Sequence, residues 1–231
     1  MSRVCSVLLS ASMSLQTPHR RALVAGGTGR VGGAIAARLR ADGWSVVAAG
    51  SADGDLRTRA GAHAVVESAA AELGGLELVV HAAGDGFEPK PVADVTEDDW
   101  DAALDVTAKG TFFLAQAAAP LLTETQGVLV VVEDVASFMP WPSFAAHCAA
   151  KAAQAMLTRV LARALAPHVR VCGVAPGPVA VEPGQEERRA AETLLGRIGS
   201  PDDVAEAVLF LAGADFVTGS TLVVDGGRLL R

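Results

Sequence analysis

The chain contains no tyrosine, and aromatic residues make up only 4% of its 231 residues. A reaction that needs a phenol as proton donor must therefore use some other group here. Cysteine is also scarce, and its three copies, Cys5, Cys148 and Cys172, are scattered along the chain. An odd number of scattered cysteines predicts reduced thiols in a cytoplasmic protein, and it argues against a disulfide framework or a metal site.

Clusters of lysine and arginine are missing as well, and the formal net charge is −7. This balance argues against nucleic acid or an anionic membrane as the main partner. The apolar stretch near the start, VCSVLLSASM, is too short and too rich in serine to span a membrane. We therefore expect residues 1–20 to be a disordered extension, with a weak signal peptide as the alternative. Met13 is a plausible beginning for a cytoplasmic enzyme.

Hydrophobic residues make up 51% of the chain, so a large core can form. From residue 21 onward, strand-like and helix-like segments alternate. Strands are expected at residues 21–27, 44–50, 76–84, 127–134, 169–179 and 220–227. Helices are expected at residues 31–43, 60–75, 96–122, 143–165 and 200–213. The alternation predicts an α/β fold in which residues 21–231 form a single doubly wound parallel sheet with helices on both faces.

A glycine-rich turn follows the first predicted strand, and its residues 27–32 fit the pattern G-x-G-x-x-G. Glycine lets the backbone turn sharply and approach a pyrophosphate, whose charge meets the start of the next helix. The turn therefore predicts a dinucleotide site, with a turn that has kept its shape but lost its ligand as the alternative. The candidate residues are Gly26, Thr28, Gly29, Arg30, Val31 and Gly32.

Over residues 21–231 the chain resembles the short-chain dehydrogenase/reductase family. The resemblance is carried by the ordered motifs AGGTGRVG, HAAG where the family often has NNAG, DVTAKG, H-x-x-x-K at 147–151, VAPGPV, GRIGSPDDVAEAVLFL and FVTGSTLVVDGG. It implies a Rossmann-type sheet, a nicotinamide cofactor and a small-molecule substrate. It also implies a homodimer or homotetramer, paired through the helices at 96–122 and 143–165.

The catalytic positions depart from the family's pattern. In the family, a Tyr-x-x-x-Lys helix supplies a proton from the tyrosine, while the lysine binds the cofactor ribose and lowers the tyrosine pKa. A serine thirteen residues before the tyrosine holds the substrate oxygen, and an asparagine supports the lysine through water. The matching positions here are Thr107, Asp134, His147 and Lys151, and only the lysine agrees.

A histidine can replace the tyrosine if its charge is balanced. Reference pKa values are about 6.5 for histidine and about 10 for tyrosine. The positive charge of Lys151 opposes protonation of an imidazole at His147, whereas the carboxylate of Asp134 favours it. Asp134, His147 and Lys151 are therefore candidates for a general-acid site. The alternative is a decayed site in which the three side chains merely satisfy one another.

Two departures resemble the pteridine-reductase branch of the family. Asp134 stands in place of the serine, and Arg30 stands in place of the central glycine of the turn. The short loop at 176–199 implies an open site, and Phe87 is the candidate to stack on a planar substrate. Against this branch, the turn also matches the G-x-x-G-x-x-G of the extended branch. An ordinary loop anchor is the other interpretation of Phe87.

The second predicted strand ends in Ala49-Gly50-Ser51 without an acidic residue, which favours NADP over NAD. Ser51 and Arg30 are the candidate phosphate partners, although Asp53 and Asp55 would repel a phosphate if they turned inward. The family usually has another helix and strand in this region, so we expect the sheet to lack one edge helix–strand unit and the adenine pocket to lose a wall. The remaining cofactor contacts that the resemblance implies are Asp55, Leu56, Ala82, Ala83, Gly84, Lys151, Pro176 and Gly177.

These observations favour an NADPH-dependent oxidoreductase that reduces a C=O or C=N bond in a small substrate, pterin-like or otherwise planar. No metal site is expected. Two alternatives remain open at this point. One is a non-redox enzyme, such as a cyclase, dehydratase or isomerase, and the other is a non-catalytic binding subunit.

Overall fold

The computed structural model describes residues 20–84, 87–181 and 183–231 of the chain. The predicted extension at 1–20 lies outside the described residues except for Arg20, as do Cys5 and Met13. Cys148 and Cys172 are both free thiols, as expected. No helix within the described ranges is long and apolar enough to cross a membrane.

Six parallel strands form one sheet in the order β2-β1-β3-β4-β5-β6. They are β1 (Arg21–Ala25), β2 (Ser45–Ala49), β3 (Leu78–His81), β4 (Val128–Val132), β5 (Arg170–Pro176) and β6 (Thr221–Val224). The predicted doubly wound sheet is thereby confirmed. β2 is the outer strand on its side and a single helix separates it from β3, as expected for a sheet without one edge unit. The order of the strands reverses between β1 and β3, which is where ligands bind in such sheets.

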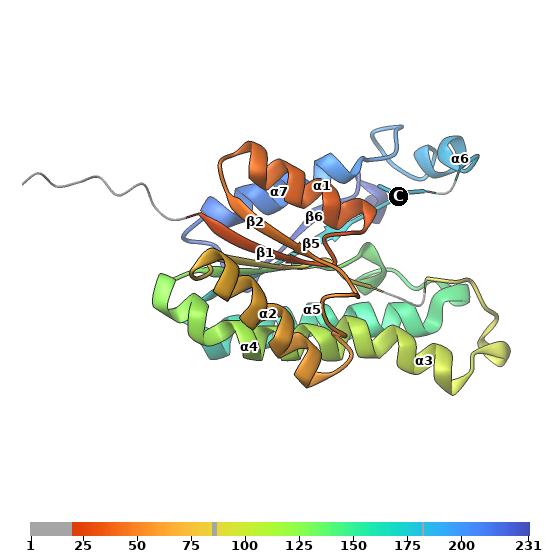
Figure 1. The fold of residues 1–231 in the computed structure, drawn as a ribbon. Helices are drawn as coiled ribbons and strands as arrows, with labels where there is room; N and C mark the ends of the chain where they lie inside the picture. The colour runs from red at the N-terminus through yellow and green to blue at the C-terminus, as the bar shows by residue number, and fades with distance from the viewer. Residues whose placement is uncertain (1–19, 85–86, 182) are drawn as a thin grey trace, which may run out of the picture.

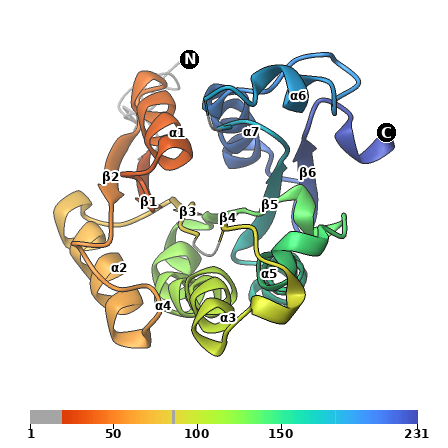
Figure 2. The same ribbon diagram turned by 90° about the vertical axis from the view of Figure 1, so that its right-hand side faces the viewer.

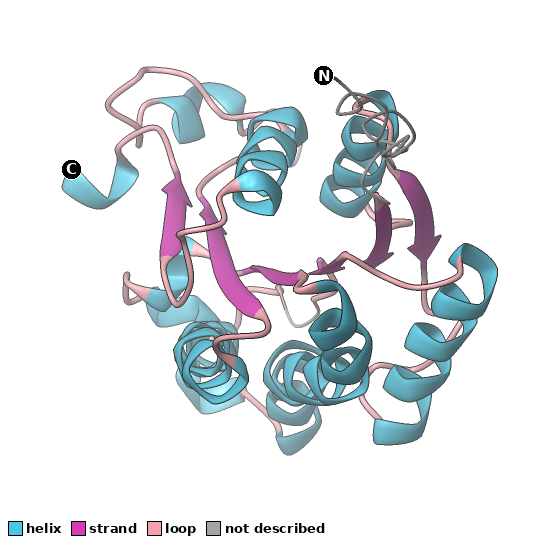
Figure 3. Ribbon diagram, turned by 90° about the vertical axis from the view of Figure 1, so that its left-hand side faces the viewer, coloured by secondary structure: helices cyan, strands magenta, loops and turns pink. Residues whose placement is uncertain are grey.

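Helices cover both faces of the sheet (Figures 1 and 2). The helices are α1 (Arg30–Ala41), α2 (Arg59–Leu73), α3 (Glu97–Leu104), α4 (Gly110–Thr125), α5 (Ala145–Leu165), α6 (Glu186–Ala190) and α7 (Pro201–Gly213). Figure 2 shows α1 and α7 on one face and α2, α4 and α5 on the other, and Figure 3 shows helices on both faces of the sheet from the opposite side. In Figure 1, α3 and α6 project past the carboxyl ends of the strands on opposite sides of the sheet.

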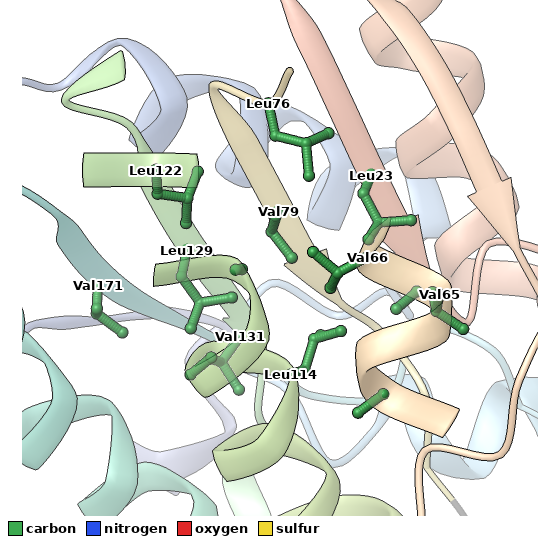
Figure 4. Close-up of a cluster of buried hydrophobic side chains, with 14 of the residues drawn as sticks. Leu23, Val65, Val66, Leu76, Val79, Leu114, Leu122, Leu129, Val131 and Val171 are labelled. Atoms are coloured by element: carbon green, nitrogen blue, oxygen red, sulfur yellow. The ribbon is translucent and has the colours of Figure 1, made fainter. Parts of the chain in front are cut away.

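The core consists of two apolar layers, one on each face of the sheet. Along β1, Leu23 belongs to the layer beneath α2 and α4, whereas Val24 belongs to the layer beneath α1 and α7. Successive side chains of a strand point to opposite faces, so a continuous apolar strand serves both layers. Figure 4 shows the first layer, where Leu23 and Val79 of the sheet meet Leu114 of α4. Each fully buried leucine contributes roughly 1.5–3 kcal/mol to this packing.

One predicted helix is interrupted in the structure. The segment at 96–122, expected as a single helix, is divided into α3, a π-helical turn at Asp105–Lys109 and α4, which continues to Thr125. At the wide turn, the carbonyl oxygen of Thr107 accepts side-chain hydrogen bonds from Thr111 and from Gln154 of α5. Single π-helical turns of this kind are frequent at functional sites, and this one brings α3 and α4 against the helix that carries His147.

The remaining helix boundaries follow local chemistry. α5 begins at Ala145 rather than at residue 143, because a 3₁₀ turn at Pro142–Phe144 precedes it. α7 begins as predicted, with Pro201 in its first turn and Ser200 exchanging capping hydrogen bonds with Asp203. The short helix α6 was not predicted, and it lies in the loop at 176–199 that was expected only to leave the site open.

Candidate active site

Two adjoining pockets lie beyond the carboxyl ends of the strands. The first has a volume of about 480 Å³ and lies where the strand order reverses, between the ends of β1, β2 and β3. The second has a volume of about 890 Å³ and extends across the ends of β3, β4 and β5 toward α6. Ala82, Ala83 and Gly84, directly after β3, line both pockets. A ligand that is long and narrow can therefore occupy both.

The glycine-rich turn forms one wall of the first pocket. Gly26 has φ +86°, and a Cβ atom there would lie 2.5 Å from the backbone nitrogen of Ala83. A side chain at Gly32 would overlap the carbonyl oxygen of Gly26. Both glycines are therefore needed for the turn to fold against the end of β3.

Gly29 differs from these two glycines. A Cβ atom at Gly29 would come no closer than 3.5 Å to the protein, and its backbone is extended with φ −79° and ψ 171°. The protein alone does not require glycine here, so the bare backbone leaves space for a ligand. Gly29 also precedes α1, whose N-terminus has no side-chain cap and whose first turn has no acidic residue. An anionic pyrophosphate fits this cradle.

The outer end of the first pocket is lined by polar residues of the β2–α2 loop. Ser51, Asp55 and Leu56 line it, whereas Asp53 does not. The Asp53 carboxylate accepts the N–H of Gly50 at 2.8 Å within its own turn. The Asp55 carboxylate binds the backbone N–H and the guanidinium of Arg57, at 3.0 Å and 2.9 Å, and this side-chain hydrogen bond lowers the Asp55 pKa.

His147 lies in the second pocket, on the first turn of α5. Only 6% of the residue is exposed, and neither ring nitrogen has a hydrogen-bond partner in the protein. Its Nε2 lies 3.5 Å from Oδ2 of Asp134, close enough for a charge interaction but longer than a good hydrogen bond. The other carboxylate oxygen of Asp134 accepts the N–H of Ala136 at 2.8 Å, which fixes the carboxylate at the end of β4.

Three aromatic side chains surround the His147 ring. Phe87 meets it edge to face at 4.9 Å between ring centroids, and Phe87 in turn stacks on Phe144 at 4.8 Å. Trp141 lies parallel to the imidazole, with an angle of 4° between the planes and 6.4 Å between the centroids. Phe87 remains 55% exposed, so one side of this aromatic group faces the open pocket. The arrangement gives a planar molecule apolar faces next to a titratable ring.

Lys151 lies one helical turn after His147 and is buried. Its Nζ donates to the carbonyl oxygen of Val132 at 3.0 Å and to Oε1 of Gln154 at 2.9 Å. A third, longer contact of 3.4 Å reaches the carbonyl oxygen of Glu133. Burial lowers the pKa of Lys151, and the carboxylates of Asp134 and Glu133 oppose that shift.

Behind Lys151, a polar network is enclosed in the protein. The Gln154 amide nitrogen donates to Thr111 at 2.9 Å and to the carbonyl oxygen of Thr107 at 3.3 Å, and it also lies 3.2 Å from Nδ1 of His81. His81 is completely buried, and burial together with the charge of Lys151 lowers its pKa to about 3. The imidazole of His81 is therefore neutral over the ordinary pH range.

Glu133, next to Asp134 in the chain, holds its carboxylate between α5 and β6. Its two oxygens accept hydrogen bonds from Thr158 of α5 at 2.7 Å and Thr221 of β6 at 2.9 Å. Gly173 on β5 provides the room, because any side chain there would overlap this carboxylate. Burial raises the pKa of Glu133, and the two hydroxyl groups oppose that shift. Glu133 thus fastens α5 to β6 beneath the site.

Comparison with known proteins assigns the chain to a family. A family model described as enoyl-(acyl carrier protein) reductase matches residues 34–228. The 4-formylbenzenesulfonate dehydrogenase TsaC1/TsaC2 of Comamonas testosteroni is 37% identical, with coverage of 90% of this chain and 96% of the relative. Dehydrogenase/reductase SDR family member 4 of Homo sapiens is 31% identical, with coverage of 97% and 93%. The chain belongs to the short-chain dehydrogenase/reductase family.

A solved structure supports the same assignment. A blue fluorescent protein from a metagenomic library, in complex with NADPH, superimposes with a TM-score of 0.82 at 28% identity and covers 90% of this chain and 97% of that chain. As a short-chain dehydrogenase/reductase, the protein is an oxidoreductase with a nicotinamide-dinucleotide site and a small-molecule substrate. The two pockets and the cradle at Gly29 fit such a cofactor.

The structure brings most of the sequence-predicted residues of this short-chain dehydrogenase/reductase together. The first pocket is lined by Gly26, Thr28, Gly29, Ser51, Asp55 and Leu56. The second is lined by Arg30, Val31, Phe87, Asp134, His147, Lys151, Pro176 and Gly177. Ala82, Ala83 and Gly84 line both. Gly32 supports the turn from behind it. Thr107 lines neither pocket, and it meets Lys151 only through Gln154.

Several residues of the site were not found from the sequence. Trp141 and Phe144 complete the aromatic group, and Gln154 binds the lysine. Gln154 had a usable signal, because a glutamine three residues after Lys151 lies on the same face of an otherwise apolar helix. The arginines at the outer end of the second pocket had no such signal. They are Arg188, Arg189 and Arg228. The described residues contain no group of three metal-ligating side chains.

Proposed function

We propose that the protein reduces a C=O or C=N bond of a small planar substrate with NADPH, and that His147 donates the proton. The observation that carries this proposal is the environment of the His147 ring. His147 is more than nine-tenths buried, it lies in a pocket continuous with the dinucleotide cradle, and neither ring nitrogen makes a hydrogen bond within the protein. A buried polar group without a partner is costly unless a ligand satisfies it.

The residues around His147 support a proton-donor role. The bound nicotinamide supplies hydride, and this chain supplies binding and the proton. Asp134 lies 3.5 Å from Nε2 of His147, so its carboxylate is an ion-pair partner for the ring when the ring carries a proton. Phe87 and Trp141 shield the ring from water, which strengthens that interaction. Lys151 binds the cofactor ribose with its third Nζ proton. Without ligand, that proton makes only the long contact to the carbonyl oxygen of Glu133.

NADP is favoured over NAD by the outer end of the first pocket. Ser51 lines it, and Asp53 is turned into its own loop. The charge of Asp55 is balanced by Arg57. NAD sites use a carboxylate that points at the ribose. A cofactor with a 2′-phosphate binds where no carboxylate points at the ribose. The NADPH complex of the similar blue fluorescent protein supports the same choice.

A small planar substrate suits the aromatic surfaces beside His147. The relative from Comamonas testosteroni is named for 4-formylbenzenesulfonate, a substituted benzene, which is consistent with such a substrate. A pterin is another planar molecule, and the pteridine-reductase-like branch therefore remains part of the proposal. So do a cytoplasmic location and a homodimer or homotetramer.

One observation favours the alternative, which is a non-redox enzyme or a non-catalytic binding subunit. Two of the three protons on Lys151 Nζ are held by Val132 and Gln154 at ordinary hydrogen-bond distances. A lysine engaged in this way gives the cofactor ribose a weaker contact. That outcome would suit a non-redox enzyme or a non-catalytic binding subunit built on the same fold.

Cofactor titration separates the two proposals. NADPH should quench the protein's fluorescence at micromolar concentration, and NADH should bind more weakly. Deuterium from labelled NADPH should appear in the reduced product of a planar aldehyde, detected by mass spectrometry. The variant His147→Ala should bind NADPH as the parent does but lose about 10²–10⁴-fold in kcat. Failure of both nucleotides to bind would favour a non-redox enzyme or a non-catalytic binding subunit.

A further inference from the structure

Basic side chains outnumber acidic ones along the second pocket, although the chain as a whole has a net charge of −7. Four arginines and Lys151 line the pocket, against the carboxylates of Glu88, Glu133 and Asp134. The two oxygens of the Glu133 carboxylate accept hydrogen bonds from Thr158 and Thr221. On α6, both arginines line the pocket and neither glutamate does. This separation of charge points to an anionic ligand group.

Arg228 is held in place before any ligand binds. Asp225, three residues earlier, accepts hydrogen bonds from the backbone N–H groups of Gly227 and Leu229, each at 2.8 Å, and so fixes the C-terminal turn. The Arg228 guanidinium lies over the Trp141 ring, 4.9 Å from its centroid, and its side chain is only 12% exposed. Stacking on an aromatic face leaves the edge of a guanidinium available for a planar oxyanion.

Glu192 holds two of these arginines at once. Its Oε2 lies 2.7 Å from Arg228 and 3.2 Å from Arg189. One carboxylate between two guanidinium groups leaves excess positive charge at this place. Arg188 adds to it, since its guanidinium donates to the neutral side chain of Gln185. The carboxylate of Glu192 shows which kind of group the two arginines bind, and a ligand can compete for them.

The same tryptophan connects the arginine to the reaction centre. Trp141 contacts both the parallel His147 ring and the Arg228 guanidinium. A planar substrate beside Trp141 would have its reacting bond near His147 and its far edge near the arginines.

We infer that the substrate is an aromatic or otherwise planar molecule that carries a carboxylate or similar oxyanion, recognised by Arg228 and Arg189. This inference rests on the proposed function for the reacting bond, but the anion site itself does not depend on turnover. Glu192 then sets the strength of anion binding, because it competes with the substrate for both arginines.

The test compares an acid with its neutral ester. Binding of 4-formylbenzoate and of methyl 4-formylbenzoate is measured by calorimetry, with the protein alone and with NADP⁺. The parent should prefer the acid. Arg228→Met keeps the apolar stem over Trp141 and removes the charge, so it should weaken acid binding by about 10–100-fold, as for a charge-assisted hydrogen bond, and leave the ester unchanged. Arg38→Met removes an arginine paired with Glu206 outside the pocket and should change neither.

A change of opposite sign makes the test independent of general damage. Glu192→Gln removes the competing carboxylate, so it should tighten binding of the acid. If Arg228→Met does not fold, as judged by thermal melting, Arg189→Met and Glu192→Gln carry the same comparison. Equal binding of acid and ester by the parent, parallel losses for both compounds, or no binding at millimolar concentration would overturn the inference. Preferential binding of the acid without NADPH oxidation would instead overturn the proposed reductase and leave the anion site standing.

Discussion

Gln154, which is fully buried, accepts a hydrogen bond from the Lys151 ammonium group at 2.9 Å. Its amide nitrogen reaches the carbonyl oxygen of Thr107, on the wide helical turn, at 3.3 Å. The family resemblance implied that an asparagine at position 107 would support the lysine through water. In this chain the Gln154 side chain makes the connection directly.

Replacing Gln154 by leucine should therefore affect both stability and cofactor binding. Leucine is similar in size but removes one of the acceptors of the buried ammonium group, which costs about 1–3 kcal/mol. Urea unfolding measures that loss. Because the lysine also loses a contact that fixes its position, the dissociation constant for NADPH should rise. The control is Gln116→Leu on the exposed side of α4, which should change neither quantity.

The pH dependence of catalysis tests His147. If the imidazolium is the proton donor, kcat of the parent should fall as pH rises and the ring loses its proton. His147→Tyr places the family's usual donor on the same turn, and its activity should persist to higher pH. Asp134→Asn removes the carboxylate 3.5 Å from Nε2, so it should lower kcat because the protonated ring loses its ion-pair partner. An unchanged profile and an undiminished rate in His147→Ala would contradict the assignment.

Two glycines of the same turn should respond differently to alanine. At Gly29 the protein leaves room for a methyl group, so Gly29→Ala should change the free energy of unfolding by no more than about 1 kcal/mol. The methyl group would fill the nucleotide cradle, and NADPH binding should weaken strongly. Gly32→Ala should unfold the protein, because its Cβ atom would overlap the carbonyl oxygen of Gly26. Equal NADPH affinity in Gly29→Ala and the parent would show that the cofactor does not approach this turn.

His81 should make stability depend on pH. Its pKa is lowered from 6.5 to about 3 in the folded protein, mainly by burial. Between these values the unfolded chain binds the proton and the folded protein does not, so stability falls as pH decreases through this range. From about pH 7.5 to about pH 5, the contribution is about 2 kcal/mol.

The measurement is urea unfolding at both pH values. His81→Asn, which introduces a residue the family often has in this motif, should lose less stability on acidification than the parent. Other titrating groups are common to both proteins and cancel in the comparison. His168→Asn changes an exposed histidine and should follow the parent. If His81→Asn loses as much stability as the parent, the buried imidazole is not responsible.

Self-association should use the helices of one face. Phe112 of α4 and Met156 and Val160 of α5 are large apolar side chains that remain exposed in the single chain. α4 and α5 lie on the same face of the sheet (Figure 2). Light scattering should give the mass of a dimer or tetramer, and Val160→Asp should shift it toward the monomer. Phe216→Asp changes an exposed phenylalanine outside these helices and should leave the mass unchanged. A monomeric parent would contradict this prediction.

The sequence by itself determined the features that depend on neighbouring residues. The alternation of strands and helices predicted the parallel sheet, since each periodicity reflects which faces are buried. The glycines after β1 were evident because such a turn needs particular residues at fixed spacing. The four-residue spacing of His147 and Lys151 placed both on one face of α5.

Only the tertiary structure decided how distant side chains meet. Arg228 and Trp141 come from segments far apart in the chain, and no local pattern indicates that a guanidinium would lie over that ring. Thr107 contacts Gln154 through its backbone carbonyl oxygen. Every residue has such an oxygen, so the residue type at this position does not reveal the contact. Adjacent carboxylates diverge at the end of β4, where Asp134 faces the pocket and Glu133 faces α5 and β6. Spacing along the chain fixes which way a side chain points from its own helix or strand. Contact between elements depends on how the folded sheet brings their ends together.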